Sequence, residues 1–304
     1  MTHVLTTRRL LAPLLVAALG LATAQPLEAF LARADLANAQ ADEALFEAYV
    51  EVAAAYAQVR EAELQVHIAE AGRALAERGV EVARLRLERG SATALELQAA
   101  ETDLREAERG ANAARDGLAL ATRNLEGITG VAFDASEPIA RERLVALDVP
   151  ADAALEAAAV HTPTVLQVRH GLALAELQVE LLDPSFASRS QIDQAELQRA
   201  QAAAGADEAR RGVTLLLRSR ANTLASALEG DRIAQAALSQ AREREDVERR
   251  RLAAGLISEL AFDQVRLQTL QAQLRAMQAE HALLAAALEL QAATLVPLEG
   301  WHGF

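Results

Sequence analysis

Histidine, cysteine and carboxylate side chains supply most catalytic and metal sites, and this chain carries them without the spacing that such sites need. Six histidines are scattered along it: His3, His67, His161, His170, His281 and His302. There is no cysteine, no His-Glu-x-x-His, no phosphate-binding loop and no Gly-x-Ser-x-Gly. Acidic pairs such as Glu101 and Asp103 lie among basic residues, where surface ion pairs on a helix explain them. The sequence predicts a protein that is not an enzyme, with no catalytic residue, metal site or cofactor.

A short pattern of arginine and glycine occurs twice and is the most informative feature of the chain. Residues 86–93 and 251–258 both read Arg-Leu-x-x-Gly-x-x-[Ser/Thr]. The second copy follows the first by 165 residues, and apolar positions keep this offset over more than forty residues. Such a shared register indicates a duplicated unit.

The residues around each copy have the spacing of a coiled coil. From Ala100 in the first copy and Val265 in the second, apolar positions advance by alternating steps of four and three. An average of 3.5 residues keeps one seam facing a partner helix. The predicted fold is all-α, with two long antiparallel coiled-coil hairpins from an internal duplication, a short connector and at most a remnant β segment.

The repeated pattern itself predicts the turn of each hairpin. Gly90 and Gly255 are expected to end a helix in the left-handed conformation, which costs glycine no Cβ clash. Thr93 is expected to start the next helix, because Thr93 and Glu96 have the spacing of a capping box. Ser258 is expected to cap similarly, without the glutamate. A single glycine of this kind would be explained as a turn residue. Two copies of the whole pattern, with the same Arg-Leu before the glycine, also fit a surface that contacts a partner.

Composition and the first residues bear on the compartment and the partners. A net charge of −13 and a pI near 5.0 argue against nucleic acid or anionic lipid. Residues 1–24 resemble a secretory signal, with Arg8 and Arg9 before an apolar stretch shorter than the roughly 20 residues of a membrane span. We therefore expect an exported protein.

Breaks in the helical pattern divide the chain into predicted parts. A short helix over 151–160 meets a break at Thr162-Pro163, a second helix reaches about Leu182, and Asp183-Pro184 stops it. The parts are a signal peptide (1–24), a first hairpin with its tip near Gly90 (25–130), a connector with short helices and a candidate strand remnant (131–192), a second hairpin with its tip near Gly255 (193–297), and a tail (298–304).

The hairpin motif resembles that of TolC-like outer-membrane efflux proteins, which are built from two repeated halves. The family motif is Gly-x-x-[Ser/Thr]-x-x-[Asp/Glu]-[Val/Leu]-x-x-Ala-x-x-x-Leu-x-x-Ala. The second copy departs from it at Ala261 and Thr269. The first copy matches every position, with Gly90, Thr93, Glu96, Leu97, Ala100, Leu104 and Ala107.

This resemblance implies a passive conduit of an efflux or secretion assembly, in the periplasm or outer membrane of a diderm bacterium. It implies a homotrimer whose hairpin tips dock a periplasmic membrane-fusion adaptor protein. Glu259 and Asp263 are candidate pore-lining acids, although family members place their gating acids at the positions of Ala261 and Gln264. The residues expected to contact the adaptor are Arg86, Leu87, Gly90, Thr93, Arg251, Leu252, Gly255 and Ser258.

The chain departs from the family where strands should cross the membrane. Family members carry two pairs of such strands, but the first half here has none and the second has only Phe186–Ile192. We therefore expect a divergent member with reduced or absent membrane strands. The alternative is a periplasmic structural or chaperone-like coiled-coil protein without channel activity. A membrane-fusion adaptor is disfavoured because Gly- and Val-rich β segments are missing.

Overall fold

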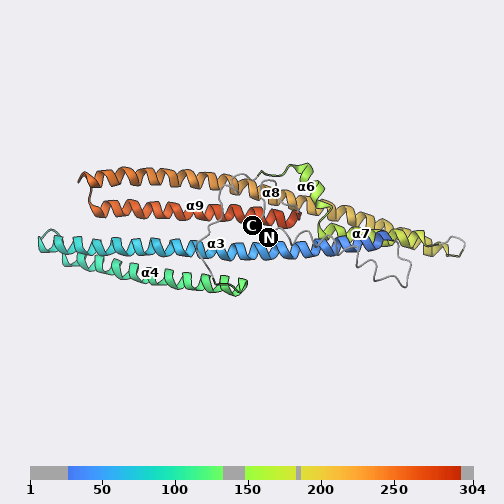
Figure 1. Ribbon diagram of the computed structural model, residues 1–304, viewed down its shortest axis with the longest axis horizontal. Helices are drawn as coiled ribbons and strands as arrows, with labels where there is room; N and C mark the ends of the chain where they lie inside the picture. Colours follow the sequence, from blue (N-terminus) through green and yellow to red (C-terminus); the bar gives the residue numbers. More distant parts are fainter. Residues whose placement is uncertain (1–26, 133–147, 183–185, 296–304) are drawn as a thin grey trace. The chain divides into compact units, whose positions relative to one another are not determined.

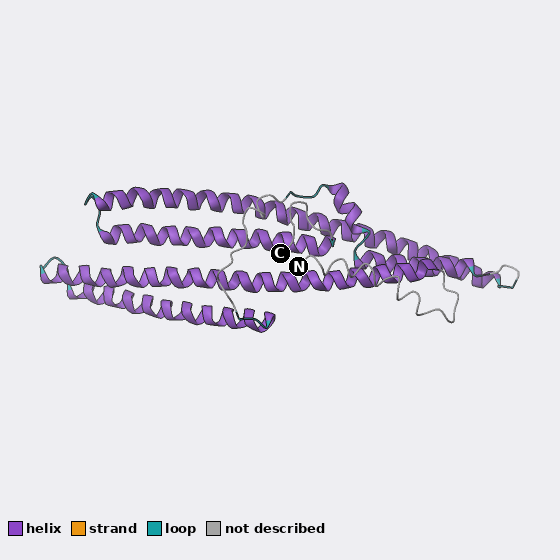
Figure 2. Ribbon diagram, viewed as in Figure 1, coloured by secondary structure: helices purple, strands orange, loops and turns teal. Residues whose placement is uncertain are grey.

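The computed structural model describes residues 27–132, 148–182 and 186–295, and in these residues it contains six helices and no strand (Figures 1 and 2). This confirms the all-helical prediction. Long helices pair in antiparallel fashion, α3 with α4 and α8 with α9. The helices are α3 (Leu27–Glu88), α4 (Ala94–Thr129), α6 (Asp152–Ala159), α7 (Pro163–Glu180), α8 (Arg189–Ala253) and α9 (Glu259–Thr294).

The helix boundaries repeat with the offset seen in the sequence. Helices α4 and α9 both contain 36 residues. The end of the long helix, the start of the return helix and its end each recur 165 residues later, as Glu88 and Ala253, Ala94 and Glu259, and Thr129 and Thr294. The duplication therefore fixes where helices begin and end, as well as which positions are apolar.

Contacts divide the chain into two compact units. Unit 1 consists of residues 1–46, 150–219 and 291–296. Unit 2 consists of residues 47–149, 220–290 and 297–304, and it contains both hairpin turns. The predicted boundaries by sequence segment remain a prediction.

In unit 2, α3 and α4 pack through a core of small and branched side chains. Ala55, Val59 and Leu125 are buried together. Tyr56 packs against them, and burial raises the pKa of its phenol. An ion pair of 3.1 Å joins Glu70 of α3 to Arg115 of α4. Burial on one helix face and charge pairing at its rim are what the coiled-coil spacing predicts.

The second hairpin has one polar residue at a core position. Thr269 occupies the place that Leu104 holds in the first copy, and it is buried. Its hydroxyl lies 3.2 Å from the carbonyl oxygen of Val265 and 3.4 Å from that of Ala241 in α8. The departure from the leucine pattern is therefore accommodated because hydrogen bonds satisfy the buried hydroxyl.

Polar contacts also tie the two hairpins of unit 2 to each other. Glu61 of α3 lies 2.9 Å from the Nδ1 atom of His281 and 3.3 Å from the Nε2 atom of Gln278, both in α9. Arg78 of α3 forms ion pairs with Glu259 and Asp263, also in α9. These contacts hold α3 beside α9 over much of the second hairpin.

In unit 1, α6 and α7 are joined by a break at the predicted position. The hydroxyl of Thr162 donates to the carbonyl of Ala159 (2.8 Å), and Pro163 begins α7. Proline suits this position because the first turn of a helix needs no N–H donor there. Leu155 and Val165 are buried in this unit, as is Leu217 of α8.

The predicted strand remnant at Phe186–Ile192 is wrong. Ser188 caps α8, which begins at Arg189, so the last four residues of the supposed strand are helical. The Ser188 N–H donates to the Oε1 atom of Gln191 (2.8 Å), and the Gln191 N–H donates to the Ser188 Oγ atom (3.4 Å). These two bonds form a capping box, which satisfies two helix-end donors locally.

Several predictions concern residues that the structure does not describe. The signal peptide at 1–24, the stop at Asp183-Pro184 and the tail at 298–304 lie outside the described residues. Among the helices that are described, none has an apolar stretch long enough to cross a membrane.

Candidate functional site at the hairpin tips

Both hairpin tips have the same backbone geometry. Gly90 has φ of 69° and Gly255 has φ of 72°, in the left-handed region. The Gly90 N–H donates to the Leu87 carbonyl (2.9 Å), and the next N–H, of Ser91, donates to the Arg86 carbonyl (2.8 Å). Together these bonds form a Schellman motif, which ends a helix with its last carbonyls satisfied.

The second tip repeats these bonds one for one. The Gly255 N–H donates to the Leu252 carbonyl (2.8 Å), and the Leu256 N–H donates to the Arg251 carbonyl (2.9 Å). The Arg-Leu-x-x-Gly pattern therefore coincides in both copies with a complete helix stop. The glycine conformation predicted from the sequence is confirmed in both copies.

The helix starts after the turns agree with the predicted caps. Thr93 and Glu96 form the capping box, with the Thr93 N–H donating to the glutamate Oε2 atom at 2.6 Å. These bonds from the Thr93 backbone and side chain, helped by the positive charge of Arg86, lower the pKa of the Glu96 carboxyl. In the second copy the Ala261 N–H donates to the Ser258 Oγ atom (3.2 Å).

The eight residues predicted to contact a partner gather at the two turns, which lie at the same end of unit 2 (Figure 1). Leu87 and Leu252 are half-buried, and the other six residues are exposed. The Arg251 guanidinium pairs with Glu248 of its own helix at 2.9 Å. Whether these residues contact a partner stays a prediction.

The two candidate pore-lining acids both face a basic side chain. Asp263 forms an ion pair with Arg78, and its side chain is only 18% exposed. Glu259 lies 3.6 Å from the same guanidinium and is largely exposed. Their role in a pore stays a prediction, while their pairing joins the second tip to α3.

The sequence did not single out the apolar side chains that the tips expose. Leu95 at the start of α4 is 74% exposed, and Leu256 beside the second glycine is 69% exposed. Leu85 and Val247, which precede the turns on α3 and α8, are also exposed. We call Leu85, Leu95, Val247 and Leu256 the tip surface. A coiled-coil pattern does not reveal it, because periodicity predicts which residues a hairpin buries in itself.

Among the described residues, no three His, Asp or Glu side chains are arranged to hold a metal ion. The tips instead offer groups suited to recognition: three exposed leucines, an exposed valine, an aromatic ring and several guanidinium groups. Arg249 lies over the ring of Phe262, with 6.0 Å between the guanidinium carbon and the ring centroid.

The sequence matches no known family profile and no curated protein. The structure, in contrast, is similar to solved outer-membrane channels over most of the chain. CusC, whose structures describe transmembrane channel formation, has a TM-score of 0.66 at 15% identity, covering 82% of this chain and 77% of CusC. The CmeC channel of Campylobacter jejuni has a TM-score of 0.60 at 11% identity, covering 91% of this chain and 68% of CmeC. The MtrE channel of Neisseria gonorrhoeae has a TM-score of 0.53 at 14% identity, covering 88% of this chain and 70% of MtrE.

At these identities the likeness is one of fold. The structure is similar over most of the chain to TolC-family outer-membrane channels, as the resemblance of the hairpin motif predicted.

Proposed function

We propose that this protein is a component of an efflux or secretion conduit and that its two hairpin tips dock a periplasmic adaptor protein. The observation that carries the proposal is the pair of identical helix stops at one end of unit 2, each accompanied by exposed leucine. The fold likeness to outer-membrane channels supports it. The turns themselves do not require the exposed side chains of Leu95 and Leu256, which provide apolar contact area for a partner.

The tip surface suits a helical partner with apolar and acidic side chains. Exposed leucine costs free energy in water, and covering Leu95 and Leu256 would recover it. The glycine turns carry no side chain, so partner atoms can approach the backbone closely. Arg86 and Arg251 would then pair with carboxylates or carbonyls of the partner.

The rest of the proposal follows the fold likeness. Three copies assemble into one conduit, the protein is exported, and it acts in the periplasm or at the outer membrane of a diderm bacterium. The protein moves its cargo passively, without catalysis or a cofactor, and the adaptor opens the passage.

A photo-crosslinking amino acid placed at the tips in cells tests the docking. We expect Leu95 and Leu256 positions to yield crosslinks to a periplasmic protein with a coiled-coil hairpin. Leu120 of α4 and Ile233 of α8 are matched controls, because they are 64% and 62% exposed but lie far along their helices from the turns. The same product from tip and control positions, or no product from the tips, would refute docking there.

A second candidate is a periplasmic structural or chaperone-like coiled coil. It is favoured by the charged stretch of α8 before the second tip, where Arg249 pairs with Glu245 (2.6 Å) and Asp246 (2.5 Å). Such pairs stabilise a helix without any partner. A solution mass measured with and without detergent separates the two functions. Recovery as a monomer in the soluble periplasm, with no adaptor co-purifying, would favour this second candidate.

A further inference from the structure

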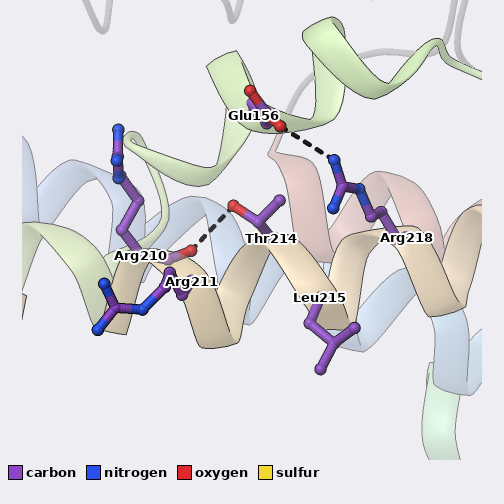
Figure 3. Close-up of a pocket in the computed structure, with 6 residues that line it drawn as sticks. All are labelled: Glu156, Arg210, Arg211, Thr214, Leu215 and Arg218. Atoms are coloured by element: carbon purple, nitrogen blue, oxygen red, sulfur yellow. Dashed lines mark hydrogen bonds and ion pairs between the residues drawn. The ribbon is translucent and has the colours of Figure 1, made fainter. Parts of the chain in front are cut away.

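A pocket in unit 1 lies between α6 and α8, and none of its lining residues belongs to the hairpin tips. It encloses about 370 Å³ and is lined by Glu156, Arg210, Arg211, Thr214, Leu215 and Arg218. Figure 3 shows Glu156 on α6 above the side chains of α8, with Arg218 extending toward it. Arg210 rises from α8 on the other side of Thr214. The volume falls in the lower range for small-molecule sites.

The lining of this pocket contains three arginines and one carboxylate, that of Glu156. Arg218 is held in place by Glu156 (3.0 Å) and by Asp152, which lies 3.3 Å away on the same helix α6. Arg211 pairs with Glu208 at 2.8 Å. Arg210 has no ion pair with any described residue. The pocket therefore combines two arginines that are already paired with one that has no ion pair among the described residues.

The apolar part of the lining limits the size and kind of ligand. Leu215 is largely exposed, although leucine gains free energy when it is covered. The hydroxyl of Thr214 donates to the carbonyl of Arg210 (2.9 Å), so the guanidinium groups are the remaining hydrogen-bond donors of the lining. An inorganic ion would leave most of the pocket volume empty and Leu215 uncovered.

We propose that this pocket binds a small organic anion with one carboxylate or phosphate head and an apolar body. The head pairs with Arg210, which presents the forked donors that match an oxyanion, and receives a second contact from Arg211 or Arg218. The body packs against Leu215. Glu156 repels the head and keeps the binding weak. The proposal does not depend on the conduit function.

Phenyl phosphate and benzoate are suitable probes, because they share an apolar ring and differ in the head group. Arginine side-chain NMR on the full chain gives a direct readout. The Nε–H of Arg218 has no hydrogen-bond partner among the described residues, so its signal will respond to a nearby anion. We expect saturable shifts of this signal at millimolar probe, and weaker ones with inorganic phosphate alone.

Three variants make the test specific. Arg210→Gln should weaken binding about fivefold by removing a charge-assisted contact, and Glu156→Gln should strengthen it about threefold by removing the competing charge. Arg232→Gln is the control, since Arg232 is an exposed α8 arginine with an i,i+3 partner in unit 2. Circular dichroism checks that each variant keeps its helices.

Opposite effects of Arg210→Gln and Glu156→Gln, with no effect of Arg232→Gln, would establish the site. Equal shifts in all variants would mean non-specific ion binding and overturn it. A signal that moves with protein concentration before any probe is added would mean that a carboxylate of another copy fills the pocket, which would also overturn the small-molecule proposal.

Discussion

Replacing the tip glycines with alanine should destabilise the protein, whereas the same replacement inside the helices should stabilise it. Gly90 and Gly255 have positive φ angles, and a Cβ atom added to either would meet no atom within 4 Å. The cost is therefore conformational and owes nothing to packing. Holding an L-residue in the left-handed region costs roughly 1–2 kcal/mol. Alanine recovers about 0.4–1 kcal/mol by restricting the unfolded chain, so each variant should lose about 1 kcal/mol.

Gly117 of α4 and Gly230 of α8 supply the matched controls. Both lie inside helices, are exposed and also have open space where a Cβ would stand. Alanine there should raise stability by about 0.5–1 kcal/mol, because glycine is a poor helix former. The two pairs of positions thus differ in backbone conformation and in little else.

Thermal unfolding followed by circular dichroism measures both effects. In a chain of 304 residues a change of 1 kcal/mol moves Tm by roughly 1.5–2 °C, which thermal unfolding resolves. We expect Tm to fall for Gly90→Ala and Gly255→Ala and to rise for Gly117→Ala and Gly230→Ala. Shifts in the same direction at all four positions would refute the argument that the repeated glycine is required by its φ angle.

Three further predictions concern single interactions. Arg78→Gln should cost about 1 kcal/mol by leaving the largely covered Asp263 carboxylate without its cation, and a double-mutant cycle with Asp263→Asn should show this coupling; additive effects would contradict it. Thr269→Val should cost about 0.5–1.5 kcal/mol in urea unfolding through its lost hydroxyl bonds, and unchanged stability would mean that they contribute nothing. The pKa of Glu96 is lowered in the folded chain from its ordinary value of 4.5, so its stabilising effect is present above that pH and is lost as pH falls through the folded pKa. The Tm difference between the wild type and Thr93→Ala should therefore be larger at pH 7 than at pH 3, and a constant difference would contradict this account.

The hairpins and their turns were predictable because their determinants are local. A glycine stop and a hydroxyl cap act over five or six residues, and an apolar seam repeats every few positions. The strand remnant at Phe186–Ile192 failed for a related reason. Ser188 and Gln191 have capping-box spacing, but a short stretch with apolar residues at both ends also fits a strand.

The contacts between helices were beyond prediction because they join distant parts of the chain. Arg78 and Asp263 are 185 residues apart, and neither belongs to a motif. The pocket likewise depends on a contact between distant residues, because Glu156, which pairs with Arg218, lies 62 residues before it. Among many charged residues on helix faces, a sequence does not indicate which ones meet across a helix pair.

The two tips have the same backbone conformation but expose different side chains, and this difference affects how a partner binds them. Ser91 follows the first glycine, whereas Leu256 follows the second, and the box glutamate Glu96 has Ala261 as its counterpart. The backbone hydrogen bonds of the two helix stops nevertheless correspond one for one. The turn thus kept its backbone geometry in both copies, while the exposed side chains diverged. A partner that contacts both tips must therefore fit two different surfaces. The surface at the first glycine is the more polar, and the surface at the second glycine is the more apolar. We therefore expect Leu256→Ser to weaken docking more than Ser91→Leu does, since only the first change removes apolar contact area.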